Sequence, residues 1–369
     1  MDKATYLQFN GNDFTNFITF VNTMNSRDKS KYSRVALLNV EDGKLVCRAI
    51  DDVRNLIEYC VELYESDNEI NEPIAASISD LSALIKSAND SEKFIIRKCF
   101  SQYEFNVIGD GWMPFKTMEA DISKFTVGGV ETEIGKINSI KLRNAISSVL
   151  GYTQDYTYAR DKYIQFNNSY MTVTSRLSSV ITADNFVEMT LHRDDAAMLK
   201  SLLKDSFDLS VIKSESDVEK TVFIGPKFKL AITASGIEPP NVKYIDDINN
   251  YIKIDCDELY KLTTLSEKYS ASKHIIGMSI KNGKLNISIK NVLAAKHSSI
   301  VNSKAVGDVK DTTKEAEVSS PNLLKTLKLF QDKHVRDVNI YITDETVEKQ
   351  NCILIFDDNT QANINIYNR

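Results

Sequence analysis

The stretch Asp42-Gly43-Lys44-Leu45 recurs almost unchanged as Asn282-Gly283-Lys284-Leu285, 240 residues further along the chain (282 − 42 = 240). Each copy lies between two short apolar runs, and Asn167-Asn168-Ser169-Tyr170 occupies a similar place halfway between them. Asp-Gly and Asn-Gly between strand-like runs are strong signals of a β-hairpin, because both central residues of a type I′ turn need a positive φ. Three hairpins about 120 residues apart predict three tandem domains, since so long a period does not fit a solenoid.

Length and composition are those of a soluble globular protein. The 369 residues are 42% hydrophobic and 26% charged, which allows two or three domains with sizeable cores. No apolar run approaches the roughly 18 residues of a membrane span, and the first residues lack the apolar segment of a signal peptide. We therefore expect a cytoplasmic protein, in the bacterial cytoplasm or nucleoid, or in a host cytoplasm if a phage encodes it.

Neither the cysteines nor the net charge indicates a particular chemistry. The five cysteines show no CxxC spacing and mostly stand in apolar runs, as buried free thiols do. The four histidines are scattered singly, so we expect no metal and no cofactor. A net charge of −6 argues against coating nucleic acid through overall positive charge, but it leaves a local basic lining open.

Each third of the chain contains two amphipathic helices, the second about 60 residues after the first. The second helices are predicted to begin behind Ser79, Asp194 and Ser320-Pro321, which are sound start signals. Apolar stripes of this kind are usually the core-facing side of a helix, and they imply no cofactor site. One stripe with this spacing is made of Leu142, Ala145, Ile146, Val149 and Leu150.

Two proline segments predict where the domains end. Met113-Pro114-Phe115 and Glu238-Pro239-Pro240 each follow a strand-like run, and proline stops a β-ladder because it has no N–H to donate. We therefore predict three domains, at residues 1–127, 128–247 and 248–369.

The third domain contains one exceptional segment, residues 297–317, which is rich in Ser, Lys, Asp and Thr and predicts a long polar loop. Taken together, the patterns predict an α+β fold of three tandem copies, each with helices on one face of antiparallel sheets.

The three-part plan resembles the bacterial β sliding clamp, the ring-shaped DNA polymerase III beta subunit. Asp42-Gly43-Lys44-Leu45 resembles the hairpin of that family's first domain, and Gln154-Asp155 with Tyr158 resembles a Gln-Asp-x-x-Tyr loop of its second. The segment 172–177 (Thr-Val-Thr-Ser-Arg-Leu) is similar to the Thr-Asp-Gly-His-Arg-Leu stretch of the family's partner-binding pocket. The chain departs from the family at residues 173–175 and at its C-terminus, where a Met-Pro-Met-Arg-Leu-like segment is replaced, so its preferred peptide should differ. The residues leave a phage or plasmid origin open.

The resemblance implies a ring that encircles duplex DNA. Six such domains make the ring, so three per chain imply a head-to-tail homodimer. The helices would line the hole and hold DNA without reading its sequence. On their own, basic residues on helices are also typical of a solvated face. The candidate DNA-binding residues are Lys29, Lys31, Lys86, Lys141, Arg143, Gln154, Tyr158, Lys200, Lys204, Lys261, Lys268, Lys325 and Lys328.

The resemblance also implies a partner pocket between the second and third domains. There a short linear peptide of a DNA polymerase or clamp loader would insert apolar anchors. Without the resemblance, the apolar candidates would be interpreted as core residues. The candidate pocket residues are Thr172, Thr174, Ser175, Arg176, Leu177, Val242, Asn322, Ile364 and Ile366.

The expected function is thus a processivity factor for DNA replication and not an enzyme. No phosphate-binding loop, HExxH or GxSxG motif occurs. The acidic pairs Asp51-Asp52, Asp194-Asp195 and Asp357-Asp358 stand at a helix start or in turns, where carboxylates have structural roles. Three alternatives remain open. The first is a clamp-fold factor that serves transcription or sequesters host factors, the second is a metal-dependent nucleic-acid enzyme that uses these pairs, and the third is a tandem interaction scaffold that stays monomeric.

Overall fold

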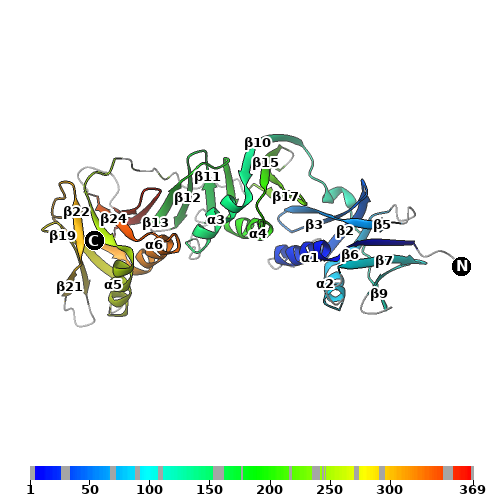
Figure 1. Cartoon of the computed structure of the whole chain (residues 1–369), viewed down its shortest axis with the longest axis horizontal. Coiled ribbons are helices and arrows are strands. Elements are labelled where there is room, and N and C mark those ends of the chain that lie inside the picture. Colours follow the sequence, from blue (N-terminus) through cyan, green and yellow to red (C-terminus); the bar gives the residue numbers. More distant parts are fainter. Residues whose placement is uncertain are drawn as a thin grey trace. The chain divides into compact units, whose positions relative to one another are not determined.

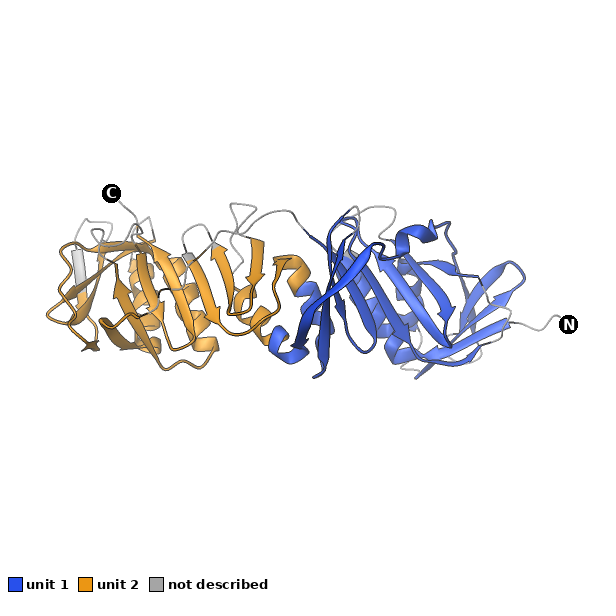
Figure 2. Cartoon of the chain, turned by 90° about the horizontal axis from the view of Figure 1, so that it is seen from above, with its two compact units in different colours: residues 1–142, 197–235 blue, residues 143–196, 236–369 orange. Residues whose placement is uncertain are grey.

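The computed structural model describes residues 5–25, 34–66, 72–87, 92–106, 111–152, 162–175, 178–215, 218–234, 242, 245, 247–269, 274–290, 296–343 and 352–366. The chain packs as two compact units (Figure 2). The first unit contains residues 1–142 and 197–235, and the second contains residues 143–196 and 236–369.

The same order of elements occurs three times along the chain (Figure 1). The first third contains β1 (Thr5–Asn10), α1 (Gly11–Asn25), β2 (Val35–Glu41), β3 (Lys44–Ile50), β4 (Leu56–Val61), β5 (Leu63–Ser66), β6 (Ile74–Ser77), α2 (Ile78–Ser87), β7 (Lys93–Cys99), β8 (Gln102–Asn106) and β9 (Trp112–Phe115). A connector with the 3₁₀ helix η2 (Ile122–Phe125) follows.

The middle third repeats this order without an equivalent of β5. It contains β10 (Val130–Asn138), α3 (Ser139–Leu150), β11 (Tyr163–Phe166), β12 (Tyr170–Ser175), β13 (Ser178–Ala183), β14 (Met189–His192), α4 (Arg193–Leu202), β15 (Asp208–Glu215), β16 (Lys220–Ile224) and β17 (Phe228–Thr233).

The last third again has every element of the first. It contains β18 (Tyr251–Asp255), α5 (Cys256–Tyr269), β19 (Ile275–Lys281), β20 (Lys284–Lys290), β21 (Lys296–Ile300), β22 (Ser303–Val306), β23 (Ala316–Ser319), α6 (Ser320–Asp332), β24 (Asp337–Ile342), β25 (Cys352–Phe356) and β26 (Thr360–Asn365).

The three predicted hairpins form, but they use two kinds of turn. Asp42 and Gly43 have φ of 48° and 72°, and Asn282 and Gly283 have φ of 51° and 68°, as the sequence predicts for these turns. The middle hairpin is closed differently, because Oδ1 of Asn167 accepts the backbone N–H groups of residues 169 and 170 at 2.9 and 2.8 Å. In the middle hairpin the Asn167 side chain therefore stabilises the turn, whereas the other two turns depend on residues with a positive φ.

The predicted caps are wrong by one or two residues, because each helix starts directly after a strand. Ser77 and Ser319, rather than Ser79 and Ser320, accept N–H groups of the first turns of α2 and α6. At α4 the acceptor is His192 and not Asp194. All six helices are capped by the last residue of the preceding strand: Asn10, Ser77, Asn138, His192, Asp255 and Ser319.

Two long sheets join strands from different thirds. In the first unit the strand order is β10-β15-β16-β17-β4-β3-β2-β6, and in the second it is β14-β11-β12-β13-β26-β25-β24-β18-β22. The pairs β4–β17 and β13–β26 are therefore equivalent junctions. Two shorter sheets have the orders β5-β1-β7-β8-β9 and β21-β20-β19-β23. Each long sheet contains strands from both sides of a predicted domain boundary, at residue 127 or 247. The two compact units therefore do not coincide with the predicted domains. The division into three domains stays a prediction.

The predicted polar loop at residues 297–317 is wrong in part, because the structure places β21, β22 and the start of β23 there. β22 is the outermost strand of its sheet and pairs only with β18, so its polar composition is that of a solvated edge. Gly307 follows it with φ of 75°, and a Cβ there would lie 2.3 Å from the carbonyl oxygen of Asn249.

In the first unit, α1 and α2 lie on one side of the strands, beside β2, β3 and β6 in Figure 1. The predicted stripe of α3 is core: Leu142, Ile146 and Val149 are fully buried. The cysteines are free thiols, and Cys47, Cys256 and Cys352 are buried as predicted.

Candidate nucleic-acid and partner interfaces

The predicted separation of charge along the helices is visible in three of them. Acidic residues occupy the first turns of α2, α4 and α5, whereas Lys86, Lys200 and Lys268 stand in their last turns. Acidic residues interact favourably with the positive end of the helix dipole, and lysines with its negative end. This arrangement leaves the later turns basic. The helices α1, α3 and α6 have no basic residue in the last turn.

The candidate DNA-binding residues differ in exposure. Lys86, Lys204, Lys261, Lys268 and Lys328 are exposed. Lys141, Arg143, Lys200 and Lys325 are half-buried. Lys29, Lys31, Gln154 and Tyr158 lie outside the described residues.

Two of the exposed lysines have polar partners. The ammonium of Lys328 lies 3.0 Å from the Asp332 carboxylate, which raises the pKa of the lysine, and that of Lys204 lies 3.4 Å from the amide oxygen of Asn16.

A lysine that no pattern in the sequence indicates, Lys227, lies beside α1, a helix without basic residues of its own. Nζ of Lys227, in the β16–β17 turn, lies 2.8 and 2.9 Å from the carboxylate oxygens of buried Asp13. The two residues are 214 positions apart, so no local pattern links them. A cavity of about 410 Å³ lies next to this pair, over the aromatic side chains of Phe20, Tyr59 and Phe228.

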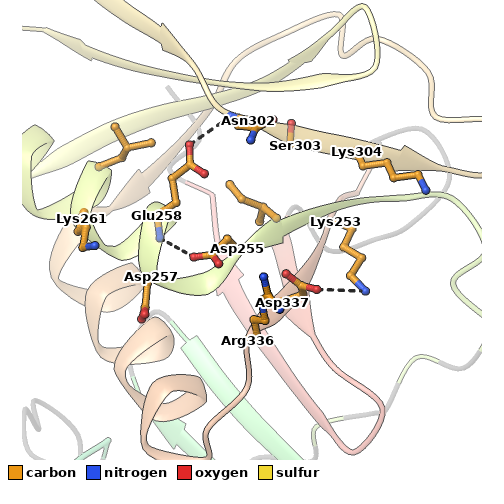
Figure 3. Close-up of a pocket in the computed structure, with 12 residues that line it drawn as sticks. Lys253, Asp255, Asp257, Glu258, Lys261, Asn302, Ser303, Lys304, Arg336 and Asp337 are labelled. Atoms are coloured by element: carbon orange, nitrogen blue, oxygen red, sulfur yellow. Dashed lines mark hydrogen bonds and ion pairs between the residues drawn. The ribbon is translucent and has the colours of Figure 1, made fainter.

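A second cavity, of about 770 Å³, lies at the start of α5 in the second unit (Figure 3). Its acidic residues are all engaged: Asp255 caps the helix, Asp257 accepts from Gln331, Glu258 accepts from the Asn302 backbone, and Asp337 pairs with Lys253 at 3.3 Å. The lining has as many acidic as basic residues, so its charge favours neither an anion nor a cation. The basic residues are Lys253, Lys261, Lys304 and Arg336.

One carboxylate from each of two acidic pairs has a structural role in a turn, as predicted, whereas Asp194 stands in the first turn of α4 without capping it. Oδ1 and Oδ2 of Asp51 accept the backbone and side-chain N–H groups of Asn55 at 2.8 and 3.0 Å. Oδ1 of Asp357 accepts the N–H groups of residues 359 and 360 at 2.9 and 2.6 Å. Across the described ranges, no three His, Cys, Asp or Glu side chains stand together as metal ligands. In those same ranges no helix is long and apolar enough to cross a membrane.

In the first unit, the sheet face away from the helices is completed by the chain itself. The connector places Phe125, which is 1% exposed, against Ile50, Leu56 and Ala231 of three adjacent strands. The N–H of Ser123 donates to the Asp121 carboxylate and so caps η2, which fixes the turn that carries Phe125.

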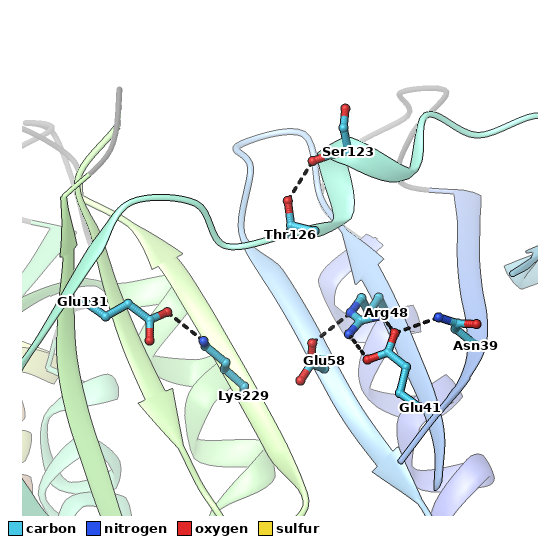
Figure 4. A network of polar contacts seen from close by, with 8 residues as sticks. All are labelled: Asn39, Glu41, Arg48, Glu58, Ser123, Thr126, Glu131 and Lys229. Carbon is cyan, nitrogen blue, oxygen red and sulfur yellow. Dashed lines mark hydrogen bonds and ion pairs between the residues drawn. The ribbon is translucent and has the colours of Figure 1, made fainter. Parts of the chain in front are cut away.

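Further along the same face, polar side chains pair with one another (Figure 4). The Arg48 guanidinium donates to Glu41 at 2.7 Å and to Glu58 at 2.8 Å, and the ammonium of Lys229 lies 2.7 Å from Glu131. The hydrogen bond from Arg48 lowers the pKa of the Glu41 carboxyl.

The equivalent face in the second unit is polar at its centre. Thr174 and Asn363 flank Ser179 across β12, β13 and β26, and Thr172 and Gln361 flank Ile181 two positions away. Because alternate residues share a face, all of these belong to one side of the sheet.

Three buried oxygens on this face have no hydrogen-bond partner among the residues that the structure describes: Oγ1 of Thr172, Oγ1 of Thr174 and Oδ1 of Asn363. Burying such a group without a partner costs about 1–3 kcal/mol. Gln361, in contrast, accepts from the N–H of Ile245 at 2.9 Å and donates to its carbonyl at 3.2 Å. Val242, near Ile245 in the chain, is half-buried.

Of the candidate pocket residues that the structure describes, Thr172 and Thr174 share one face of the sheet, and Ile364 does not lie on that face. Ile364 lies on the same side of β26 as Thr360. The hydroxyls of Thr360 and Thr182 both accept hydrogen bonds from Lys333, which follows the end of α6. Ile364 therefore faces the helices, on the opposite side of the sheet from Thr172 and Thr174. The apolar character of Ile364 does not show which face of the sheet it lies on, because that face depends on the register of β26 with β13.

The other candidates lie elsewhere or outside the described residues. Asn322 lies in α6, and Ile366 follows β26 and is half-buried. Ser175 pairs with position 178 at the end of the hairpin, and Arg176 and Leu177 lie outside the described residues.

Comparison with solved structures places the whole chain in one fold. The chain is similar to DNA polymerase III subunit beta from Borrelia burgdorferi, solved in complex with a natural product, with a TM-score of 0.74 and 12% identity over 100% of both chains. It is similar to the DnaN sliding clamp from Pseudomonas aeruginosa bound to griselimycin, with a TM-score of 0.77 and 14% identity over 99% of this chain and 100% of that one. The chain has the fold of the DNA polymerase III β subunit.

A solved structure from a third organism is similar to the chain over the same length. The beta subunit from Thermotoga maritima matches with a TM-score of 0.75 and 11% identity, over 99% of this chain and all of that one. No protein-family model and no curated protein matches the sequence. The chain therefore shares the sliding-clamp fold over its full length. Sequence identities of 11–14% establish a common fold and nothing more.

Proposed function

We propose that the protein is a DNA sliding clamp, a non-enzymatic processivity factor that acts in the cytoplasm. Two copies would close head to tail around duplex DNA and tether a DNA polymerase. The full-length fold supports this proposal, and the arrangement of the strands carries it.

The strand arrangement leaves one junction open. Within the chain, β17 pairs with β4 and β26 pairs with β13. By the repeated order of elements, β9 is the equivalent of β17 and β26, and β21 is the equivalent of β4 and β13. Both β9 and β21 are outermost strands in the described parts of their sheets. The third junction is therefore β9 of one copy with β21 of a second, which is a head-to-tail contact.

Exposed apolar side chains mark both of these edges. Met113 of β9 is 48% exposed, and Ile300 of β21 is 73% exposed. At the end of α5, the helix before the hairpin that leads to β21, Leu265 and Tyr269 are 50% and 66% exposed. One exposed apolar side chain on each of the two edge strands suits a protein interface there.

The proposed contact with DNA has a low affinity. The exposed lysines at the ends of the helices supply a local basic surface on a chain of net charge −6. Contacts of this kind are made to phosphates, so they fade as salt rises. The ring topology, rather than affinity, would then keep the protein on DNA.

Partners would bind through short linear peptides in the second unit. We assign them to the sheet face that carries Thr172 and Thr174, where Ile245 of the connector is bonded to Gln361. A DNA polymerase and a clamp loader are the partners expected of such a factor.

Light scattering tests the ring directly. We expect a particle of twice the chain mass of 41.7 kDa. Ile300→Asp should produce monomers, because it places a charge in the β9–β21 junction. Val130→Asp is the matched control, since Val130 is 72% exposed on β10, the outermost strand of another sheet.

Retention on DNA completes the test. The dimer should stay on closed circular DNA after loading and leave once the circle is cut. A monomeric wild-type protein, or equal loss of dimer in both variants, would exclude the head-to-tail ring.

A further inference from the structure

The cavity beside α1 in the first unit, which we name the aromatic cavity, has one unpaired polar group in an apolar wall. Its volume of about 410 Å³ lies within the range of about 300–1,000 Å³ that is usual for sites of small organic ligands. Phe20, Tyr59, Phe207 and Phe228 line it, and Phe207 lies edge-on to Phe228 with ring centroids 6.1 Å apart. Tyr59 is 8% exposed, and its hydroxyl has no hydrogen-bond partner among the residues that the structure describes.

The equivalent place in the second unit is closed by the chain itself. Tyr59 pairs with Phe228, the first residue of β17, and in the same register Thr182 pairs with Thr360, the first residue of β26. There the ammonium of Lys333 lies 3.1 Å from the Thr182 hydroxyl and 2.7 Å from that of Thr360. The first unit thus keeps a cavity and an unpaired hydroxyl at a position where the second unit has internal hydrogen bonds.

The charged groups around the aromatic cavity balance one another. The ammonium of Lys204 lies 3.4 Å from the amide oxygen of Asn16, so it spans from the end of α4 to α1. Lys227 is bonded to the carboxylate of buried Asp13, and Asp205 also lines the cavity. Two ammonium groups are therefore matched by two carboxylates, and this balance favours an uncharged ligand over an ion.

The Tyr59 hydroxyl narrows the class of ligand further. Burial raises the pKa of Tyr59 to about 12, with a smaller contribution from the Asp13 carboxylate, so the hydroxyl keeps its proton at neutral pH. It can then both donate and accept a hydrogen bond. A hydrocarbon ligand would leave this hydroxyl unpaired, which is costly in a buried place. A bare anion would lie against aromatic side chains that offer it no hydrogen bond.

A nucleobase meets all of these conditions. Its flat faces stack on aromatic side chains, and this stacking is tolerant of the identity of the base. Its edge carries donors and acceptors that suit a tyrosine hydroxyl, and the ring system is uncharged.

We propose that the aromatic cavity binds an unstacked nucleobase between its aromatic side chains, with the edge of the base on the Tyr59 hydroxyl. The base comes from single-stranded DNA or from a free nucleoside. Only the first of these sources rests on the proposed function, in which α1 and α4 belong to the face that surrounds DNA. Binding of the base itself needs one unit of one chain.

Saturation-transfer NMR with deoxyadenosine as the probe tests this proposal on the full-length protein. We expect transfer to the base protons and no binding of deoxyribose 5-phosphate, which lacks a base. Tyr59→Phe should weaken deoxyadenosine binding about tenfold, the equivalent of one hydrogen bond. Tyr163→Phe is the matched control, because Tyr163 is 7% exposed in the second unit and its loss of a hydroxyl should leave the affinity unchanged.

Thr19→Trp tests the cavity without altering its walls. Thr19 is exposed on α1 at the rim of the cavity, so a bulky side chain there should fill the space and abolish binding. Absence of transfer to the base, wild-type affinity in Tyr59→Phe, or binding that survives Thr19→Trp would overturn the proposal.

Two further measurements separate the source of the base and the failure of the ring. Displacement of deoxyadenosine by a short single-stranded oligonucleotide assigns the site to DNA, and failure to displace it assigns the site to a free nucleoside. Ile300→Asp, which should be monomeric, should bind deoxyadenosine like the wild type. Loss of the dimer with intact binding would therefore count against the ring and leave the aromatic cavity supported.

Discussion

Replacing Phe125 with alanine tests whether the connector holds the first unit together. The ring is 1% exposed and packs against strands of the first and middle thirds. Truncating a buried phenylalanine costs about 3–5 kcal/mol, because apolar contacts are lost and a cavity remains. A typical domain has only about 5–15 kcal/mol of net stability, so a large part of it would disappear. Ile122→Ala, in the same turn but 49% exposed, should change stability by about 0.5 kcal/mol or less.

Urea denaturation measures both variants with a local probe. Trp112 is the sole tryptophan, and it lies in β9 under the Arg97 guanidinium, 3.8 Å from the ring centre. Its fluorescence therefore reports on the first unit. We expect Phe125→Ala to lower the midpoint with little change in slope. An unchanged midpoint, or an equal loss in Ile122→Ala, would refute the idea that this side chain completes the sheet face.

Three further predictions concern single side chains. Because Arg48 lowers the pKa of Glu41, that pair adds stability above the unfolded pKa of about 4.3, and the contribution is lost as pH falls through the folded pKa. Glu41→Gln should therefore flatten the acid limb of a stability–pH curve, and an unchanged limb would contradict this. Lys333→Met should lower the thermal midpoint, because it removes the half-buried ammonium that donates to the hydroxyls of Thr182 and Thr360. An equal or higher midpoint would contradict this prediction. Gly43→Ala should cost about 1 kcal/mol in denaturant titration, because φ is 72°, whereas Gly128→Ala, with open space and no positive φ, should cost less.

Local patterns predicted the elements well because they depend on neighbours in the chain. The turn at Asp42-Gly43 and the stripe of α3 were both visible in the sequence and are confirmed. The caps were misplaced because a residue such as Ser77 serves as the last strand residue and as the cap at once. The polar composition of residues 303–306 was interpreted as loop, although an edge strand tolerates the same residues.

The candidate site was harder to predict because it depends on register. Thr172 and Ile364 both looked like pocket residues, yet a strand sends alternate side chains to opposite faces, and nothing local specifies which strands of distant thirds meet. The same limit hid Lys227, whose partner Asp13 lies in the first helix.

The β4–β17 junction has a consequence for the time course of synthesis. Val61 ends β4 and Phe228, which begins its partner β17, stands 167 positions later in the chain (228 − 61 = 167). At about 5–20 residues per second, a ribosome needs roughly 8–33 s to make that stretch. During this interval β4 is an unprotected sheet edge on the nascent chain, where a neighbouring chain on the same messenger could pair with it and a chaperone would prevent that.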